Sequence, residues 1–308
     1  MPPLTRSLSQ WRDAVRRIEQ HGFDSISVSE HLTHGWQMEP LSAMLAAAAA
    51  TDRLRVLSLV LANDFRHPVM LHKAAATIDV VSAGRLELGL GAGWMLDDYV
   101  AAGLPFDPPA VRVARLGESI GVLKGLFGPT PFTFKGDHYH ISDLQGLPKP
   151  VQQPHPPILV GGGAKAILSL AAREADIVGI HCNLQAGTLT PGAAADLGAD
   201  RVAQKVNWVR QAATAAGRAA ESIELQFSMY FCQITRTASQ GRAASSSFAE
   251  LLRADPKLMA TSPTVLTGTV DQCIETLCER RERYGFSYLK LGSDVTSVAP
   301  IVARLAGT

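Results

Sequence analysis

A carboxylate and an imidazole stand side by side at the point where a short apolar segment ends. The segment Ser-Ile-Ser-Val, residues 25–28, runs directly into Ser29, Glu30 and His31. An imidazole with an ordinary pKa of about 6.5 can give or take a proton, and an adjacent carboxylate can supply a charge or a hydrogen bond. The same pair is also typical of a helix start in which the histidine bonds a backbone carbonyl. The pattern therefore raises proton transfer by Glu30 and His31 as a hypothesis.

Two glycine-rich turns are further candidates. Residues 161–165, Gly-Gly-Gly-Ala-Lys, follow an apolar run and open a helical pattern, so their backbone N–H groups could converge on an anion at the positive end of a helix. The turn has neither the GxGxxG pattern nor P-loop spacing, and a tight turn without a ligand would look the same. Residues 89–94, Gly-Leu-Gly-Ala-Gly-Trp, are similar. Two such turns at one rim would leave room for a flat ligand.

Aromatic and histidine side chains near these segments allow a binding role but indicate no metal site. Trp36 and Trp94 could stack on a ring, although tryptophans at a barrel rim also commonly cover the core. His67 and His72 have no convincing carboxylate partner, and the sequence contains no HExxH motif. We therefore expect no metal ligands.

The charge balance argues against partners that are attracted by a general electrostatic field. The 308 residues include 29 basic and 28 acidic side chains, for a formal net charge of +1. We therefore expect neither nucleic acid nor a membrane as a partner. Any anion must be held by a local site.

Cysteine usage and the start of the sequence predict a reducing, cytoplasmic setting. The four cysteines form no CxxC pair, and no secretory apolar segment opens the chain. The longest apolar stretch, residues 43–50, is mostly alanine and is too short to span a bilayer. We expect neither disulfides nor a membrane span.

Apolar runs that alternate with amphipathic segments must position these residues, and this alternation is typical of a parallel sheet covered by helices. Strands are expected at 25–28, 55–62, 86–91, 158–160, 176–180, 222–234 and 288–291. Helices are expected at 11–22, 41–51, 68–84, 113–127, 165–173, 204–216 and from Thr269, which stands in capping-box spacing with Gln272. A small hairpin is expected around 135–137.

Seven such strands predict an α/β fold, a TIM (β/α)8 barrel that forms one domain over residues 1–308. Residues 1–7 contain two prolines and make a poor central strand, so the first strand is expected to be missing or irregular. The proline-rich segment 129–157 breaks the alternation and predicts an insertion. In such barrels the active site lies at the carboxyl ends of the strands, where the candidate residues stand.

Four segments together resemble the luciferase-like family of flavin and deazaflavin oxidoreductases. They are SVSEHL at 27–32, ANDFRHPVMLHKAAATIDVVSAGRLELGLGAGW at 62–94, PKPVQQPHPPILVGGG at 148–163 and TGTVDQCIETLCERRERYGFSYLKL at 267–291. The similarity extends from Leu8 to Leu305 and is closest to the actinobacterial branch that uses coenzyme F-420. This resemblance, and not the periodicity, supplies the cofactor.

The resemblance implies a luciferase-like TIM barrel with a flavin-type ring over its mouth. The implied phosphate contacts are Gly161, Gly162, Gly163 and Ala164, with Lys165 beside them. The implied ribityl contacts are Gly91, Ala92 and Gly93. The implied ring contacts are Asn63 together with Leu59, Val60 and Leu61, a segment in which relatives carry a non-proline cis peptide. Glu30 and His31 would face the reactive edge of the ring.

The function implied is hydride transfer between coenzyme F-420 and an unknown small organic substrate, with His31 moving the accompanying proton. The nearest alternative is an FMN-dependent monooxygenase of the same fold, which needs a flavin reductase as partner. A non-catalytic cofactor-binding barrel is the second alternative. Relatives are often dimers, so a homodimer is one expected state.

The substrate pocket is the variable part of the family. The expected pocket residues are Trp36, Trp94, His181 and Asn183. The candidates for meeting the oligoglutamate tail are Lys165, Arg112 and Arg115.

Overall fold

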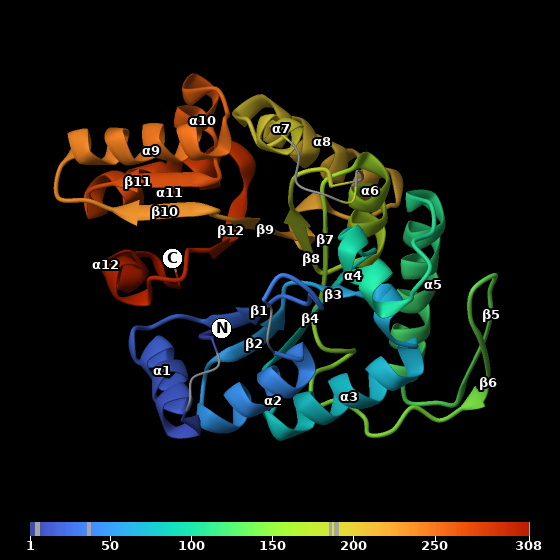
Figure 1. The fold of residues 1–308 in the computed structure, drawn as a ribbon. Helices are drawn as coiled ribbons and strands as arrows, with labels where there is room; N and C mark the ends of the chain where they lie inside the picture. Colours follow the sequence, from blue (N-terminus) through green and yellow to red (C-terminus); the bar gives the residue numbers. More distant parts are fainter. Residues whose placement is uncertain (4–6, 36–37, 185–186, 188–190, 308) are drawn as a thin grey trace. The chain divides into compact units, whose positions relative to one another are not determined.

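Parallel strands flanked by helices make up both of the compact units into which the chain divides (Figure 1). The computed structural model describes residues 1–3, 7–35, 38–184, 187 and 191–307. Unit 1 consists of Met1–Glu19, Asp24–Gly161 and Glu174–Asp176, and unit 2 consists of Gln20–Phe23, Gly162–Arg173 and Ile177–Thr308. A single domain over residues 1–308 stays a prediction.

The sheet of unit 1 is parallel throughout. Its strands are β1 (Ser25–Val28), β2 (Arg55–Ser58), β3 (Leu61–Ala62), β4 (Leu86–Gly91) and β7 (Ile158–Gly162, of which Gly162 belongs to unit 2). The order is β1-β2-β4-β7, and β3 pairs with β4. Every residue of β4 is buried, as expected for a strand covered on both faces. Because the strands are parallel, their carboxyl ends lie at one edge of the sheet.

The helices of unit 1 are α1 (Leu8–Gln20), α2 (Pro40–Ala50), α3 (Pro68–Val81), α4 (Leu96–Ala102) and α5 (Pro109–Phe127), with a 3-10 turn η1 (Asn63–Phe65) before α3. Proline stands in the first turn of α2, α3 and α5, where its missing N–H costs nothing. Leu116, Ile120 and Leu123 of α5, spaced by four and three residues within the helix expected at 113–127, are fully buried. Figure 1 shows α2 and α3 side by side, below β2 and β4.

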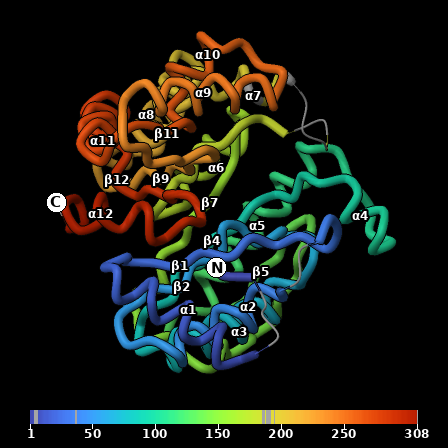
Figure 2. Tube along the Cα trace, turned by 60° about the vertical axis from the view of Figure 1, so that its left-hand side comes forward, coloured from blue at the N-terminus to red at the C-terminus, as the bar shows by residue number. Residues whose placement is uncertain are grey.

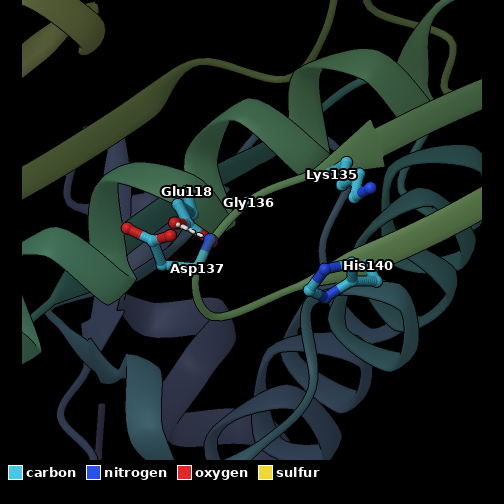
Figure 3. Close-up of a pocket in the computed structure, with 5 residues that line it drawn as sticks. All are labelled: Glu118, Lys135, Gly136, Asp137 and His140. Carbon is cyan, nitrogen blue, oxygen red and sulfur yellow. Dashed lines mark hydrogen bonds between the residues drawn. The ribbon is translucent and has the colours of Figure 1, made fainter.

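The expected insertion forms the antiparallel hairpin of β5 (Phe132–Lys135) and β6 (His140–Leu144). Glu118 of α5 accepts hydrogen bonds from the backbone N–H groups of Asp137, His138 and Tyr139, at 2.8–3.0 Å. Burial raises the pKa of this carboxyl, but the three N–H groups lower it overall. Figure 3 shows Glu118 against the turn of the hairpin, in a surface pocket. Glu118 thereby fixes the position of Tyr139.

Unit 2 contains the parallel strands β8 (Ile177–Ile180), β9 (Glu224–Ser228) and β12 (Phe286–Lys290), paired in the order β8-β9-β12. Its helices are α6 (Lys165–Glu174), α7 (Pro191–Ala195), α8 (Ala199–Ala215), α9 (Ala238–Leu252), α10 (Pro256–Thr261), α11 (Val270–Tyr284) and α12 (Val295–Leu305), with a 3-10 turn η2 (Ala220–Ser222). The capping box of Thr269 and Gln272 at the start of α11 is confirmed.

The prediction of one long strand at 222–234 was wrong. The run divides into β9, which pairs with β8 and β12, and β10 (Phe231–Ile234), which pairs with β11 (Val265–Gly268) in a separate parallel sheet. Phe231 does not continue the pairing of β9: it pairs with Val265 of β11, and its ring stacks on Phe248 of α9, with ring centroids 4.4 Å apart. Figure 2 shows α9 and α10 next to β11. The strand β11 and the helices α9 and α10 were not predicted.

The part of the chain described before α1, residues 1–3 and Ser7, contains no strand. This agrees with the expectation that the prolines at positions 2 and 3 would not form a central strand. The terminal amino group of Met1 instead donates to the carbonyl of Ser27 in β1, at 2.6 Å. No helix in the described part of the sequence is long and apolar enough to span a membrane.

Candidate active site

His31 lies at the carboxyl end of β1 and is held by Asp98 of α4. Its Nδ1 is 2.8 Å from Oδ2 of Asp98. The side chain of His31 is 12% exposed and that of Asp98 is 2% exposed, so the pair is largely shielded from water. The ring of Trp94 meets the imidazole edge to face, with centroids 5.5 Å apart and planes at 82°. The structure therefore brings together one predicted catalytic residue and one predicted pocket residue.

Asp98 also holds the loop that follows β1. Its Oδ1 accepts hydrogen bonds from the backbone N–H groups of Leu32 and Thr33 and from the Thr33 hydroxyl, at 2.6–3.0 Å. Burial acts to raise the pKa of Asp98, but these hydrogen bonds and that of His31 lower it overall. The carboxyl therefore stays ionised in spite of its burial.

Glu30, the other predicted catalytic residue, has its carboxylate turned toward different partners. It accepts hydrogen bonds from both terminal nitrogens of Arg66 and from the backbone N–H of Ala62, which lies 2.8 Å from Oε2. The side chain of Glu30 is 3% exposed. This arrangement ties the end of β1 to the end of β3. A catalytic role for Glu30 stays a prediction.

The segment that was expected to back the ring lies beside the glycine turn of β4. The peptide bond between Leu59 and Val60 is cis, within the segment where the resemblance predicted such a bond. Leu59 and Leu61 are buried, whereas Val60 is half-buried. A Cβ on Gly91 would stand 2.8 Å from Cγ2 of Val60 and 3.8 Å from the carbonyl oxygen of Gly161. The ends of β4 and β7 and the segment before β3 therefore meet at one place in unit 1.

Arg112 shapes the turn that was expected to line the ribityl chain. Its guanidinium donates to the carbonyl oxygens of Ala92 and Gly93, and it lies 4.2 Å from the centroid of the Phe106 ring. Gly93 has a φ of +75°, and a Cβ there would collide with the Tyr99 hydroxyl at 1.8 Å. Arg112 is only 3% exposed, so its charge serves this turn and is not presented to solvent as a tail-binding site would require.

Asn63 and Asp64, which follow β3, take part in a polar network with residues from α4, α5 and the hairpin. Asp64 accepts hydrogen bonds from the Tyr99 hydroxyl at 3.0 Å and from Arg115 at 2.9 Å. Arg115 also binds Asp107, so this candidate for the coenzyme's tail is likewise engaged within the protein. Burial and the Asp64 charge raise the pKa of Tyr99, which keeps its hydroxyl protonated.

Asn63 itself is 2% exposed, and its Nδ2 donates to the hydroxyl of Tyr139 at 3.3 Å. Its Oδ1 has no hydrogen-bond partner among the described residues. Buried polar atoms are seldom left without a partner, so an acceptor of this kind marks a place where a ligand or a water can bind. Asn63 therefore offers such an acceptor directly after β3.

The glycine turn of unit 2 follows β7 and opens α6. A Cβ on Gly163 would stand 2.2 Å from the carbonyl oxygen of Cys182, so only glycine lets the chain pass this close to the end of β8. Gly162 and Ala164 are half-buried, and the side chain of Lys165 is exposed. The turn thus keeps the strand–glycine–helix form that suits a phosphate, although its phosphate contacts stay a prediction.

His181 and Asn183, the pocket residues expected in unit 2, follow β8. Nδ1 of His181 lies 2.8 Å from the Tyr230 hydroxyl. Burial, followed by the charges of Lys290 and Lys205, lowers the pKa of His181 to about 4. Asn183 is exposed. The fourth expected pocket residue, Trp36, lies outside the described residues.

Lys205 anchors the start of the loop after β8. It is fully buried, and its ammonium donates to the carbonyl oxygen of His181 at 2.7 Å and to the carboxylate of Asp196. Burial lowers the pKa of Lys205, while the neighbouring Asp196 acts to raise it.

In the described part of the chain, no group of three or more His, Cys, Asp or Glu side chains could hold a metal ion.

Sequence reasoning missed Asp98, Tyr139, Tyr230 and Lys205. Asp98 offered one usable signal, because it lies four residues after Trp94 and so falls on the helix that begins at the predicted glycine turn. The other three gave no local signal, since the candidate residues that they contact, Asn63 and His181, are 24 to 76 residues away in sequence.

This arrangement of parallel strands with site residues at their carboxyl ends agrees with the comparisons. The family model of the luciferase-like monooxygenases matches residues 2–287, and the chain belongs to this family. The family and its solved members confirm the predicted fold class, an α/β barrel of the luciferase-like type. The members are oxidoreductases that include both F-420-dependent and FMN-dependent enzymes.

Two curated relatives represent these two kinds of cofactor. The F-420-dependent glucose-6-phosphate dehydrogenase of Amycolatopsis mediterranei is 31% identical over 223 residues, which are 69% of this chain and 62% of that protein. The FMNH2-dependent dimethylsulfone monooxygenase of Pseudomonas putida is 33% identical over 169 residues, 54% of this chain and 46% of that protein. The chain therefore matches less than two thirds of the length of either relative.

Solved structures show the fold at lower identity. The F-420-dependent tetrahydromethanopterin reductase of Methanopyrus kandleri has a TM-score of 0.77 at 15% identity, over 96% of this chain and 94% of that chain. A monooxygenase of Streptomyces bottropensis has a TM-score of 0.74 at 23% identity, over 97% and 92%.

Proposed function

We propose that the protein is an oxidoreductase that transfers a hydride between coenzyme F-420 and a small organic substrate. The observation that carries the proposal is the buried pair of His31 and Asp98 at the carboxyl end of β1. A hydride transfer to or from an oxygen-bearing carbon moves a proton as well, and that proton needs a group held in a fixed position. Asp98 and Trp94 hold the side chain of His31 in such a position.

The residues of unit 1 fit a flavin-type ring. The buried Oδ1 of Asn63 has no partner among the described residues, and the N–H on the pyrimidine edge of such a ring is a donor that it can bind. Leu59, Val60 and Leu61 would back the ring, and Gly91, Ala92 and Gly93 would line the chain attached to it. The deazaflavin of coenzyme F-420, when bound, accepts or gives a hydride at its central carbon.

In unit 2, the turn of Gly162, Gly163, Ala164 and Lys165 would bind phosphate, with Gly161 preceding it in unit 1. The backbone N–H groups at the start of α6 would supply hydrogen bonds and the positive end of a helix. The substrate contacts expected of His181 and Asn183 stay a prediction for unit 2.

The relatives support coenzyme F-420 as the cofactor, but one of them also supports FMN. F-420-dependent glucose-6-phosphate dehydrogenases recur among the curated relatives, and one match covers 69% of this chain. The 33% identity to an FMNH2-dependent monooxygenase favours an FMN-dependent monooxygenase, served by a reductase partner, as the second candidate. The buried proton-transfer pair is the reason to place hydride transfer first.

Turnover assays with both cofactors test the proposal. The protein is incubated without oxygen with oxidised coenzyme F-420 and a panel of secondary alcohols and sugar phosphates, and the loss of the deazaflavin's visible absorption is followed. A parallel assay supplies reduced FMN and oxygen, and measures oxygen consumption with the same panel and with organosulfur compounds.

Anaerobic reduction of coenzyme F-420 by a member of the panel, lost in His31→Ala, supports the proposal. Substrate-dependent oxygen consumption with FMN alone would establish the monooxygenase instead. Binding of either cofactor with no turnover in any assay would assign a non-catalytic cofactor-binding barrel.

A further inference from the structure

We infer that Asp98 is a positioning residue that keeps the proton of neutral His31 on Nδ1, so that Nε2 is the nitrogen that exchanges a proton with substrate. The consequence for turnover rests on the proposed function, whereas the position of the proton on His31 does not.

The two oxygens of Asp98 have separate tasks. Oδ1 accepts the hydrogen bonds from the N–H groups of Leu32 and Thr33 and from the Thr33 hydroxyl. Oδ2 does not take part in those three hydrogen bonds and lies 2.8 Å from Nδ1 of His31. One carboxylate thereby fixes both the loop that carries the imidazole and the rotation of the imidazole itself.

The charge of Asp98 decides which ring nitrogen carries the proton. An ionised carboxylate can only accept hydrogen bonds, so the nitrogen that faces it must be the donor. The hydrogen bonds from Thr33, His31 and Leu32 outweigh burial and lower the pKa of Asp98, which keeps it ionised at neutral pH. In a neutral imidazole with the proton on Nδ1, the lone pair lies on Nε2.

Two further contacts restrict the imidazole. The ring of Trp94 meets it edge to face at 5.5 Å, which disfavours a ring flip that would exchange the two nitrogens. Thr33 is itself held by two hydrogen bonds to Asp98, so the loop next to His31 cannot move independently of that carboxylate.

A neighbouring pair in the same two segments provides a natural contrast. Nε2 of His34 lies 2.9 Å from Oδ2 of Asp97, but both side chains are 58% exposed. Water competes for an exposed pair of this kind, so its hydrogen bond is weak and its geometry is loosely held. Asp97 is therefore the matched control for Asp98, one residue away on the same helix.

The exchange of Asp98 for asparagine should reverse the position of the proton without unfolding the loop. The amide oxygen can replace Oδ1 and keep the hydrogen bonds from Leu32 and Thr33. The amide nitrogen would stand in the place of Oδ2 and donate to Nδ1 of His31. Nδ1 must then be the acceptor, and the proton moves to Nε2.

Nitrogen NMR of protein labelled with 15N-histidine reads the proton position directly, because protonated and unprotonated ring nitrogens have distinct shifts. The nine histidines give nine imidazoles, and the signal of His31 is assigned by its loss in His31→Gln. Spectra are recorded at about pH 8, above the ordinary histidine pKa of about 6.5, for wild type, Asp98→Asn and Asp97→Asn.

We expect His31 to be protonated on Nδ1 in wild type and in Asp97→Asn, and on Nε2 in Asp98→Asn. A wild-type signal with the proton on Nε2, or with both nitrogens protonated, would overturn the inference. An unchanged His31 signal in a folded Asp98→Asn variant would overturn it equally. If that variant does not fold, the wild-type spectrum alone still shows which nitrogen of His31 carries the proton.

Turnover gives the second readout and separates this inference from the proposed function. With a substrate in hand, Asp98→Asn should lower kcat by roughly 10²- to 10⁴-fold, the usual contribution of a positioned acid or base, with little change in the cofactor's Kd. Asp97→Asn should change neither. The expected NMR result in a protein that turns over no substrate would leave the role of Asp98 standing and remove the proposed function alone.

Discussion

Both terminal nitrogens of Arg66 bind the carboxylate of Glu30, the residue that precedes His31 in the sequence. The backbone N–H of Ala62 adds a third hydrogen bond to the same carboxylate. Side-chain exposures of 3% for Glu30 and 19% for Arg66 make this a mostly buried ion pair. It joins the end of β1 to the end of β3 and so fixes the strand end from which His31 projects.

Replacing Arg66 by alanine should strongly destabilise the protein, because it leaves the Glu30 carboxylate buried without its counter-charge. We expect the free energy of unfolding to fall by about 3 kcal/mol or more. Urea denaturation at neutral pH measures it. Asp13→Asn is the control, because the Asp13–Arg16 pair is exposed and spans 3.6 Å, and its loss should cost less than about 1 kcal/mol.

An equal, small loss of stability in both variants would contradict a structural role for the Glu30–Arg66 pair. The stability and the turnover of Glu30→Gln together test the predicted catalytic role of Glu30. If the variant keeps its stability but loses turnover, Glu30 acts in the chemistry. If stability falls and kcat per folded molecule does not, it acts as an anchor.

A second prediction concerns acid stability and His72 of α3. His72 is 2% exposed, and its Nε2 has no hydrogen-bond partner in the described part of the chain. Burial first, and then the charge of Lys149, lowers the pKa of His72 to about 4. The folded protein therefore disfavours the charged imidazole, whereas the unfolded chain binds a proton near pH 6.5. Stability should be highest above pH 6.5 and fall as the pH drops toward 4.

The size of this effect follows from the two pKa values. Between about pH 7.5 and pH 5, wild type should lose about 2 kcal/mol more stability than His72→Gln, which cannot titrate. Urea denaturation at both pH values provides the comparison. His140→Gln, at an exposed position on the hairpin, should keep the pH dependence of wild type. If the free energy of unfolding of His72→Gln falls between these pH values as much as that of wild type, His72 is not the cause of the pH dependence.

Much of the fold could be predicted because its signals are local. The strands β1, β4 and β8 and the helix α5 follow from the pattern of apolar residues. The capping box at Thr269 was readable because its partner stands three residues away.

The division of residues 222–234 could not be predicted, because it depends on a distant partner. Phe231 continues an apolar run in the sequence, but its place is decided by Phe248 and by pairing with Val265 of β11. Periodicity alone does not show where one sheet ends and another begins.

The candidate site divides in the same way. His31 and the glycine turns were readable because they directly follow apolar runs. The partner of His31 lies 67 residues away, and that of Glu30 lies 36 residues away. Sequence reasoning therefore identified residues that could do chemistry, whereas only the structure shows which partners orient them.

The cofactor is the central claim, and paired binding titrations test it most directly. Purified, cofactor-free protein is titrated with oxidised coenzyme F-420 and, separately, with FMN, and the absorption spectrum and fluorescence of each cofactor report its Kd. We predict that coenzyme F-420 binds at least about tenfold more tightly than FMN, a difference of about 1.4 kcal/mol. Tighter binding of FMN, or binding of neither cofactor, would contradict the account.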